Sequence, residues 1–155
     1  MIAHIASTLS DIGLQGQASP TYTTPVTEPK PLVLVLDDEE NIRRMMRTYL
    51  ERHAYAAVEA ATVDAAVAVV RNMPVSAVIL DVRLPGAGSG LDVLAMLRKI
   101  PEMATVPVLI VTGSILTEEE EHQVTRERAY VIYKPEGFET IVNFLDQLTG
   151  RDFSD

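Results

Sequence analysis

Five short apolar segments alternate with amphipathic segments along residues 32–149, and this pattern predicts the fold. The first, third and fourth apolar segments are almost unbroken, which is typical of strands covered on both faces. Five strand–helix pairs in succession favour a parallel sheet with right-handed crossovers, so we predict a five-stranded, doubly wound α/β domain. The predicted strands are residues 32–36, 57–60, 76–80, 107–111 and 129–133. The predicted helices are residues 39–53, 62–72, 89–100, 117–127 and 137–149.

Two of the predicted helices differ in how much apolar surface they can bury. In the helix at 117–127 only Val124 is clearly apolar, and a capping box of Thr117 and Glu120 opens it. Because little burial holds it, we expect this helix to be comparatively mobile, either as a partner-binding face or simply as a solvated surface helix. The helix at 39–53 has an apolar stripe with three arginines outside it. The stripe consists of Ile42, Met45, Met46, Tyr49 and Leu50, and the arginines are Arg43, Arg44 and Arg47.

Residues 1–31 do not continue the alternation. Residues 19–31 are rich in Thr and Pro and have no apolar periodicity, which indicates a tail or linker. Before them, Ile2, Ile5, Leu9 and Ile12 fall near one helical face. Two interpretations of this segment therefore stay open. It is either a frayed terminus or a short amphipathic helix that docks on this domain or on a partner. Residues 150–155 form a short C-terminal tail, and no second domain is expected.

Composition narrows the classes of function. The 155 residues include 22 acidic and 13 basic residues, for a net charge of −9. This balance argues against nucleic acid as the partner, because phosphate contacts require clustered Lys and Arg. The absence of Cys excludes disulfides and thiolate metal sites. No apolar run reaches the length needed to span a membrane, and the first residues lack the features of a signal peptide, so the expected location is the cytosol.

Polar residues stand where four of the apolar segments end. An acidic run, Asp37-Asp38-Glu39-Glu40, follows the first segment, and Asp81 follows the third. Thr112 follows the fourth segment and Lys134 the fifth. The carboxyl ends of parallel strands share one edge of the sheet, which is where ligands bind in open α/β folds. Carboxylates with one hydroxyl and one ammonium suit a divalent cation and a phosphoryl group.

These motifs resemble the receiver domain of two-component response regulators. The matching pieces are Asp37-Asp38, Asp81 with Leu84-Pro85 downstream, Thr112, and Lys134-Pro135, in this order and each at a predicted strand end. The resemblance implies a flavodoxin-like sheet of the receiver type. It also implies that Asp81 is a nucleophile that becomes an aspartyl phosphate, with no enzymatic activity beyond the chain's own Mg²⁺-dependent phosphorylation and dephosphorylation.

The resemblance further assigns a Mg²⁺ site. It places Asp38, Asp81 and the backbone carbonyl of Arg83 directly on the metal, with Asp37 acting mostly through water. The chemistry agrees, because Mg²⁺ is typically held by one or two carboxylates together with waters and phosphate oxygens. An alternative for Asp38 is that it caps a helix starting at Glu39.

Two further residues are expected to contact the phosphoryl group. Lys134 would pair with Asp81 at rest and with a phosphoryl oxygen after transfer. Thr112 would donate a hydrogen bond to a phosphoryl oxygen. In receivers the Lys–Pro bond corresponding to Lys134–Pro135 is usually cis, which would fix the position of the amine.

The chain departs from the family pattern at two places. The Gly-rich loop at residues 85–90 is one residue longer than usual, and it lacks the ending of a P-loop. Many receivers carry an aromatic residue three positions before the Lys, and it moves inward with the Thr on phosphorylation. That position is Val131 here, flanked by Tyr130 and Tyr133. The sequence therefore leaves open whether the usual Thr/aromatic switch operates with Val131 at this position.

The leading hypothesis is a stand-alone receiver. It would take phosphate from a histidine kinase or a phosphotransfer protein and signal to an unidentified protein target by contact, and a homodimer stays open. One alternative is a binding module that keeps the fold without being phosphorylated. Another is an enzyme on a similar sheet, either a flavin carrier or an aspartate-based phosphatase. The adjacent acids Asp37 and Asp38 disfavour both enzymes, since they would repel a flavin phosphate and lack the one-residue spacing of such phosphatases.

Overall fold

A single parallel sheet of five strands forms the centre of the protein in the computed structural model, which describes residues 29–84, 89–134 and 137–150. The strand order is β2-β1-β3-β4-β5, and all four neighbouring pairs are parallel. The strands are β1 Leu32–Leu36, β2 Ala56–Ala60, β3 Val75–Leu80, β4 Val108–Thr112 and β5 Tyr130–Tyr133. The helices are α2 Glu40–Arg52, α3 Val63–Asn72, α4 Gly90–Arg98, the short 3₁₀ helix η1 Pro101–Met103, α5 Glu118–Arg126 and α6 Phe138–Thr149. The predicted doubly wound sheet is confirmed.

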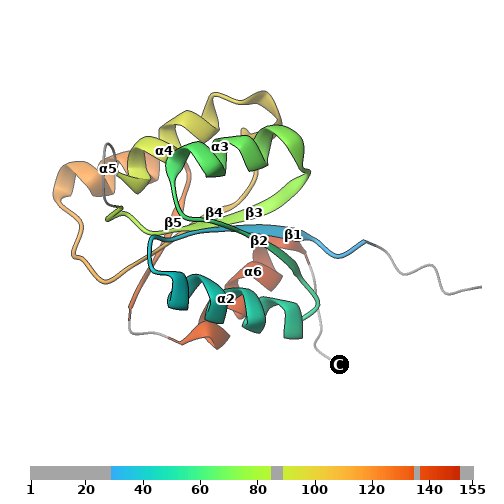
Figure 1. The fold of residues 1–155 in the computed structure, drawn as a ribbon. Coiled ribbons are helices and arrows are strands. Elements are labelled where there is room, and N and C mark those ends of the chain that lie inside the picture. The colour runs from blue at the N-terminus through green and yellow to red at the C-terminus, as the bar shows by residue number, and fades with distance from the viewer. Residues whose placement is uncertain (1–28, 85–88, 135–136, 151–155) are drawn as a thin grey trace, which may run out of the picture.

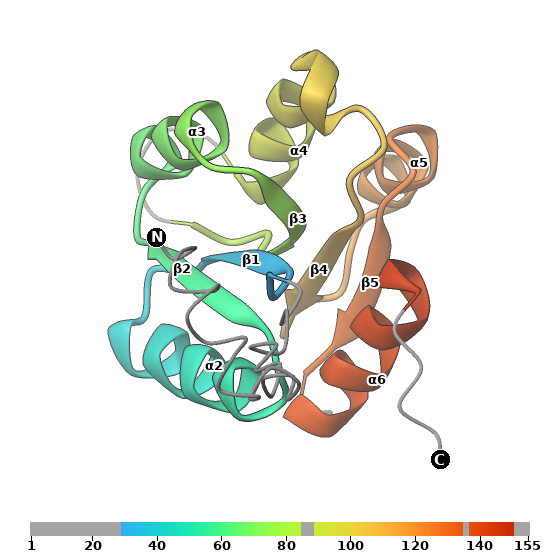
Figure 2. The same cartoon turned by 90° about the vertical axis from the view of Figure 1, so that its right-hand side faces the viewer.

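Helices cover both faces of the sheet. Figures 1 and 2 show α2 and α6 on one face and α3, α4 and α5 on the other. Alternation along β1 supplies both layers, since Val33 and Val35 pack in the core beneath α2 and α6, whereas Leu34 and Leu36 pack in the opposite core. This double burial explains why the central strands read as unbroken apolar runs.

Short polar side chains fix where three of the helices begin. The hydroxyl of Thr62 accepts the backbone N–H of Ala65 at the start of α3. Ser89 with Asp92 forms a capping box on α4. Thr117 with Glu120 forms the capping box predicted for α5, and Val124 is the one buried residue of that helix. The capping box and the single buried residue predicted for α5 are confirmed, and its mobility stays a prediction.

The apolar face of α2 differs from the predicted stripe. Met45 is 54% exposed, so its assignment to the buried stripe is wrong. The side chain of Arg43, which was placed outside the stripe, is only 13% exposed. It can lie there because its guanidinium is paired with Glu59 on β2 and donates to the carbonyl oxygen of Asp37. Burial of a charged head is tolerated when its hydrogen bonds are satisfied.

Several predictions fall outside the part of the chain that the structure describes. They are the amphipathic segment with its Thr/Pro-rich continuation as far as residue 28, the loop at 85–88, the Lys134–Pro135 bond and residues 151–155. Among the helices that are described, none has both the length and the apolar character required to cross a bilayer.

Candidate functional site

The four polar positions predicted at the strand ends meet at one edge of the sheet. Asp37 follows β1, Asp81 follows β3, Thr112 ends β4 and Lys134 follows β5. Backbone hydrogen bonds extend the ladders beyond the strands and hold these positions in register. The N–H of Asp81 donates to the carbonyl oxygen of Leu36 at 3.2 Å, and the N–H of Lys134 donates to that of Thr112 at 2.8 Å. Asp81 and Lys134 are therefore held in place by the hydrogen bonds of the sheet.

One ammonium group faces two buried carboxylates at this edge. Lys134 Nζ lies 3.2 Å from Asp81 Oδ2 and 3.9 Å from Asp37 Oδ2. Asp81 is 9% exposed and Asp37 6% exposed. The predicted pairing of Lys134 with Asp81 is thus present. A single positive charge cannot balance both carboxylates, so the pocket carries excess negative charge.

Backbone amides orient both carboxylates. Asp81 Oδ1 accepts the N–H of Arg83 at 3.0 Å, and Asp37 Oδ1 accepts the N–H of Glu39 at 2.9 Å. In each case a side chain binds the backbone two residues on, which is the Asx-turn pattern. The second oxygen of each carboxylate is left facing Lys134.

Asp38 does not cap α2, so that alternative is wrong. The helix begins one residue later than assumed, at Glu40, and its N-cap residue Glu39 makes no side-chain cap hydrogen bond. Asp37 takes the N–H of Glu39 instead. Asp38, the next residue along the chain, is exposed. Its role as a direct metal ligand stays a prediction.

Thr112 is fully buried beside this pocket. Its hydroxyl oxygen accepts the N–H of Ser114 at 3.1 Å, within the turn that follows β4. Over the described residues, its hydroxyl makes no hydrogen bond with Asp81. The structure therefore brings Asp37, Asp81 and Lys134 into direct contact and holds Thr112 on the neighbouring strand.

A cavity of about 280 Å³ lies beneath the charged groups. Asp37, Asp81 and Lys134 line it together with apolar side chains of the sheet and of α2 and α6, including Met46 and Phe138. Burial against these walls raises the pKa of Asp37 above its usual 3.8, and the Asp81 and Asp38 charges add to this rise. The N–H of Glu39 and the Lys134 ammonium oppose it without cancelling it.

The raised pKa of Asp37 predicts a stabilising substitution. The folded protein holds the Asp37 proton more tightly than the unfolded chain, so stability is lost as pH rises from 3.8 through the higher folded pKa. The loss persists at neutral pH. Asp37→Asn keeps an acceptor for Glu39 and removes the charge, so we expect a higher Tm at pH 7 in EDTA, with the gain shrinking as pH falls through the carboxyl range.

Thermal denaturation across pH measures this effect. The matched control is Asp64→Asn, which removes an exposed carboxylate on the surface of α3. A lower Tm for Asp37→Asn at pH 7 in EDTA would contradict the prediction.

The carboxylates at this edge fit Mg²⁺ in number and type. Within the described residues, no group of three or more His, Asp or Glu is arranged to hold a metal. The pocket instead offers two buried carboxylates, Asp37 and Asp81, with Asp38 exposed beside them. Mg²⁺ keeps several waters and takes one or two carboxylates together with phosphate oxygens, so two carboxylates with excess negative charge are sufficient.

Two residues at the site were not identified from the sequence. Arg43 Nη1 donates to the carbonyl oxygen of Asp37 at 2.9 Å, and its Nε lies 3.2 Å from Glu59 Oε1, so it ties α2 and β2 to the residue after β1. The only clue in the sequence was the position of Arg43 beside the apolar stripe of the helix. This position does not distinguish it from a solvent-exposed arginine, because its partners lie on other elements.

Gly90 is the second. Its N–H donates to the carbonyl oxygen of Val82 at 2.8 Å. A Cβ atom at this position would lie 2.0 Å from the carbonyl oxygen of Asp81 and 2.8 Å from its carbonyl carbon. The first residue of α4 therefore packs directly on the backbone of Asp81. The clue in the sequence was a glycine near the start of a predicted helix, which can indicate that the backbone approaches another segment closely.

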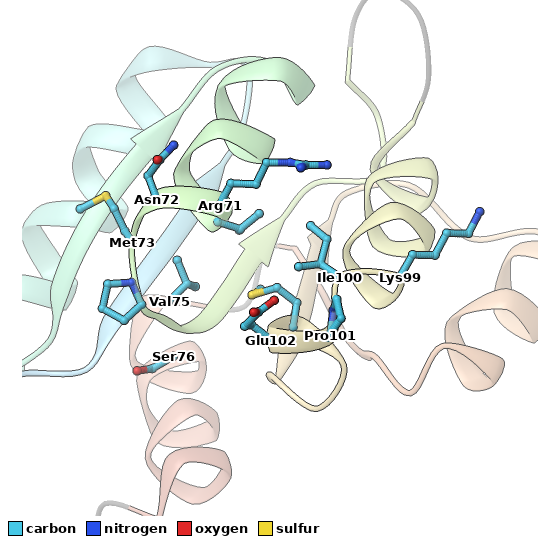
Figure 3. Close-up of a pocket in the computed structure, with 12 residues that line it drawn as sticks. Arg71, Asn72, Met73, Val75, Ser76, Lys99, Ile100, Pro101 and Glu102 are labelled. Carbon is cyan, nitrogen blue, oxygen red and sulfur yellow. The ribbon is translucent and has the colours of Figure 1, made fainter.

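A different hollow, of about 830 Å³, lies at the other end of β3. The segment from Arg71 to Ser76 faces the segment from Lys99 to Met103 across it (Figure 3). Glu102 is the one acidic residue among the described residues that line it. The hollow lacks the paired carboxylates found at the opposite edge of the sheet, so it is not suited to bind Mg²⁺ together with a phosphoryl group.

Comparison with known proteins identifies the family. A family model described as "Response regulator receiver domain" matches residues 33–146. The chain belongs to the response regulator receiver family. The receiver is 38% identical over 81 residues to "Transcriptional regulatory protein ResD" of Bacillus subtilis (strain 168), which is 52% of this chain and 32% of that protein. It is 30% identical over 91 residues to "Transcriptional regulatory protein BaeR" of Escherichia coli O6:H1, which is 59% of this chain and 36% of that protein.

Solved receiver structures have the same fold. The crystal structure of a response regulator receiver protein from Pseudomonas putida matches with a TM-score of 0.71 and 25% identity, covering 77% of this chain and 98% of that one. A CheY-like receiver domain protein from Methanospirillum hungatei JF-1 matches with a TM-score of 0.72 and 21% identity, covering 78% of this chain and 94% of that one. The alignments with ResD and BaeR span only about a third of those proteins, so the activities of the whole relatives do not transfer to this receiver.

Proposed function

We propose that Asp81 accepts a phosphoryl group from a phosphohistidine of a histidine kinase or of a phosphotransfer protein. The observation that carries this proposal is the Asp81–Lys134 pair, 3.2 Å apart at the shared edge of β3 and β5. One oxygen of Asp81 is oriented by the N–H of Arg83 and the other is paired with the ammonium. A carboxylate held in this way is ready to act as a nucleophile.

The transfer exchanges one bond to phosphorus for another. A carboxylate oxygen of Asp81 forms the new P–O bond, and the P–N bond of the donor breaks. The imidazole nitrogen leaves with the electron pair, and Asp81 becomes an acyl phosphate. Lys134 can then pair with a phosphoryl oxygen, and the Thr112 hydroxyl can turn from Ser114 to donate to another.

Bound Mg²⁺ would be held by Asp81 with Asp38 and the carbonyl of Arg83, and by Asp37 through water; it would screen the charge of the incoming phosphoryl group. The burial of Asp37 beside Asp81 supports a divalent cation at this edge, because the single Lys134 ammonium does not balance two buried carboxylates.

The proposal includes signalling to a protein partner by direct contact. The net charge of −9 supports a protein partner over nucleic acid. Three exposed glutamates in the first turn of α5, Glu118, Glu119 and Glu121, offer a surface for such contact.

A second candidate is a receiver-like module that binds partners without phosphorylation. Val131 favours it, because this residue is partly buried in the core on the α5 side and has no ring to move inward. The Asp81–Lys134 pair argues against it, since a module without phosphoryl chemistry has no need of a charge pair at this position.

Intact-mass spectrometry after treatment with acetyl phosphate separates the two. We expect one phosphoryl group per chain in Mg²⁺, little in EDTA, and loss of the added mass on treatment with hydroxylamine, which cleaves acyl phosphates. An unchanged mass in Mg²⁺ would favour the phosphorylation-independent module.

A further inference from the structure

Arg83 links the phosphoryl-accepting residue to the start of α5. Its backbone N–H donates to Asp81 Oδ1, as described above. Its guanidinium donates to both carboxylate oxygens of Glu120, Nη1 to Oε2 at 2.8 Å and Nη2 to Oε1 at 3.2 Å. One residue therefore contacts the acceptor through its backbone and α5 through its side chain.

Glu120 also caps its own helix. Its Oε1 accepts the N–H of Thr117 at 2.9 Å, and its N–H donates to the hydroxyl of Thr117 at 3.1 Å. The Arg83 guanidinium, followed by the Thr117 N–H, lowers the pKa of Glu120. The carboxylate that completes the first turn of α5 is thus the one that ties this turn to the loop after β3.

The two ends of α5 are held with unequal strength. Arg98 anchors the C-terminal end, since its Nε donates to the carbonyl oxygen of Glu127 at 2.8 Å and its Nη2 to that of Arg128 at 3.2 Å. The helix itself buries only Val124. At the other end the Arg83–Glu120 pair has side chains 46% and 20% exposed, and ion pairs at such exposure are weak. Leu116, just before the helix, is 5% exposed and packed in the core, so the part that can be released is the first turn of α5 that follows it.

The Arg83 guanidinium lies close enough to Asp81 for their charges to attract. Its pKa is raised, mainly by its hydrogen bond with Glu120 and to a lesser extent by Asp81. A phosphoryl group on Asp81 would replace the single charge of the carboxylate with up to about two negative charges, and it would bring three strong acceptor oxygens. Guanidinium binds phosphate oxygens in the same bidentate manner as a carboxylate, so the phosphoryl group would compete directly with Glu120.

We propose that Arg83 exchanges partners, pairing with Glu120 while Asp81 is unmodified and with the phosphoryl group once Asp81 carries it. This inference rests on the proposed phosphorylation of Asp81. The exchange frees the first turn of α5, while the other end stays held by Arg98. It gives this receiver a route from the acceptor to α5 that needs no aromatic residue at Val131.

Hydrogen exchange of the full chain, followed by mass spectrometry with and without acetyl phosphate in Mg²⁺, tests the exchange of partners. Phosphorylation is measured by intact mass on the same samples. We expect amides at residues 117–121 to exchange about 5-fold faster in the phosphorylated protein, the size expected for loss of one weak contact. Unmodified Arg83→Ala should already show this faster exchange, and phosphorylation should add nothing further.

Glu120→Gln isolates the ion pair, because Gln still completes a capping box with Thr117. It should match Arg83→Ala before phosphorylation, whereas Glu119→Gln, which removes an equal charge from the same turn, should behave as wild type. Labelled wild-type protein with unchanged exchange at 117–121 would overturn the inference and leave the proposed function standing. If phosphorylation of Arg83→Ala accelerated exchange at 117–121 as much as it does in the wild type, the inference would likewise be overturned and the proposed function would stand. Failure of labelling would overturn the proposed function and the inference with it.

Discussion

Replacing Asp81 by Asn should reduce labelling by acetyl phosphate from about one group per chain to none. An amide is a poor nucleophile, so no acyl phosphate can form at this position. The fold should survive, because the Asn side chain has the same shape as Asp and its carbonyl oxygen can still accept the N–H of Arg83. Loss of the pairing with Lys134 should lower stability only slightly, because the Lys134 ammonium also lies near the Asp37 carboxylate. Intact-mass spectrometry measures the labelling, and thermal denaturation reports on the fold.

Asp64→Asn is the matched control, since it makes the same chemical change at an exposed position on α3. It should be labelled as wild type. If Asp81→Asn gains a phosphoryl group at the wild-type rate, Asp81 is not the acceptor. The proposed function would then have to be rebuilt around another nucleophile.

Gly90→Ala should destabilise the domain by about 3 kcal/mol, a fall in Tm of roughly 10 °C. The added Cβ would lie 2.0 Å from the carbonyl oxygen of Asp81, and the contacted atom belongs to the backbone, so it cannot rotate away. Either α4 or the residue after β3 must move. We therefore expect labelling of Asp81 to slow as well. Urea denaturation measures the stability, and the initial rate of acetyl phosphate labelling measures the displacement of the site.

Gly113→Ala provides the comparison for stability. A Cβ at Gly113 would approach the Cδ atom of Lys134 at 3.8 Å, which is an ordinary van der Waals distance. Its free energy of unfolding should stay within about 0.5 kcal/mol of wild type. A Gly90→Ala variant as stable as Gly113→Ala would show that the close approach of α4 to Asp81 is not required.

The local pattern of this chain specified most of the architecture. The unbroken runs at 76–80 and 107–111 marked strands buried on both faces, and the 3.6-residue spacing of Ile141, Leu145 and Leu148 marked the last helix. Since five strands in succession with helical crossovers must run parallel, the residues after their carboxyl ends had to share one edge. The pairing of Lys134 with Asp81 followed from that topology.

The sequence did not decide which member of an adjacent pair turns inward. Asp37 and Asp38 have the same side chain, and successive residues near a strand end point in different directions. The structure buries Asp37 and exposes Asp38. The error on α2 has a different cause, because Arg43 is turned toward the protein by its bonds to Glu59 and to the Asp37 carbonyl, which lie on other elements.

By itself, the sequence determined the elements, their order and the chemistry gathered at one edge, because hydrophobic periodicity and strand ends are local properties of the chain. Only the tertiary structure decided that Gly90 lies against the backbone of Asp81 and that Arg83 reaches Glu120. Such contacts join residues of different structural elements. They depend on how the twisted sheet and its helices come together, and no spacing within one segment encodes that arrangement.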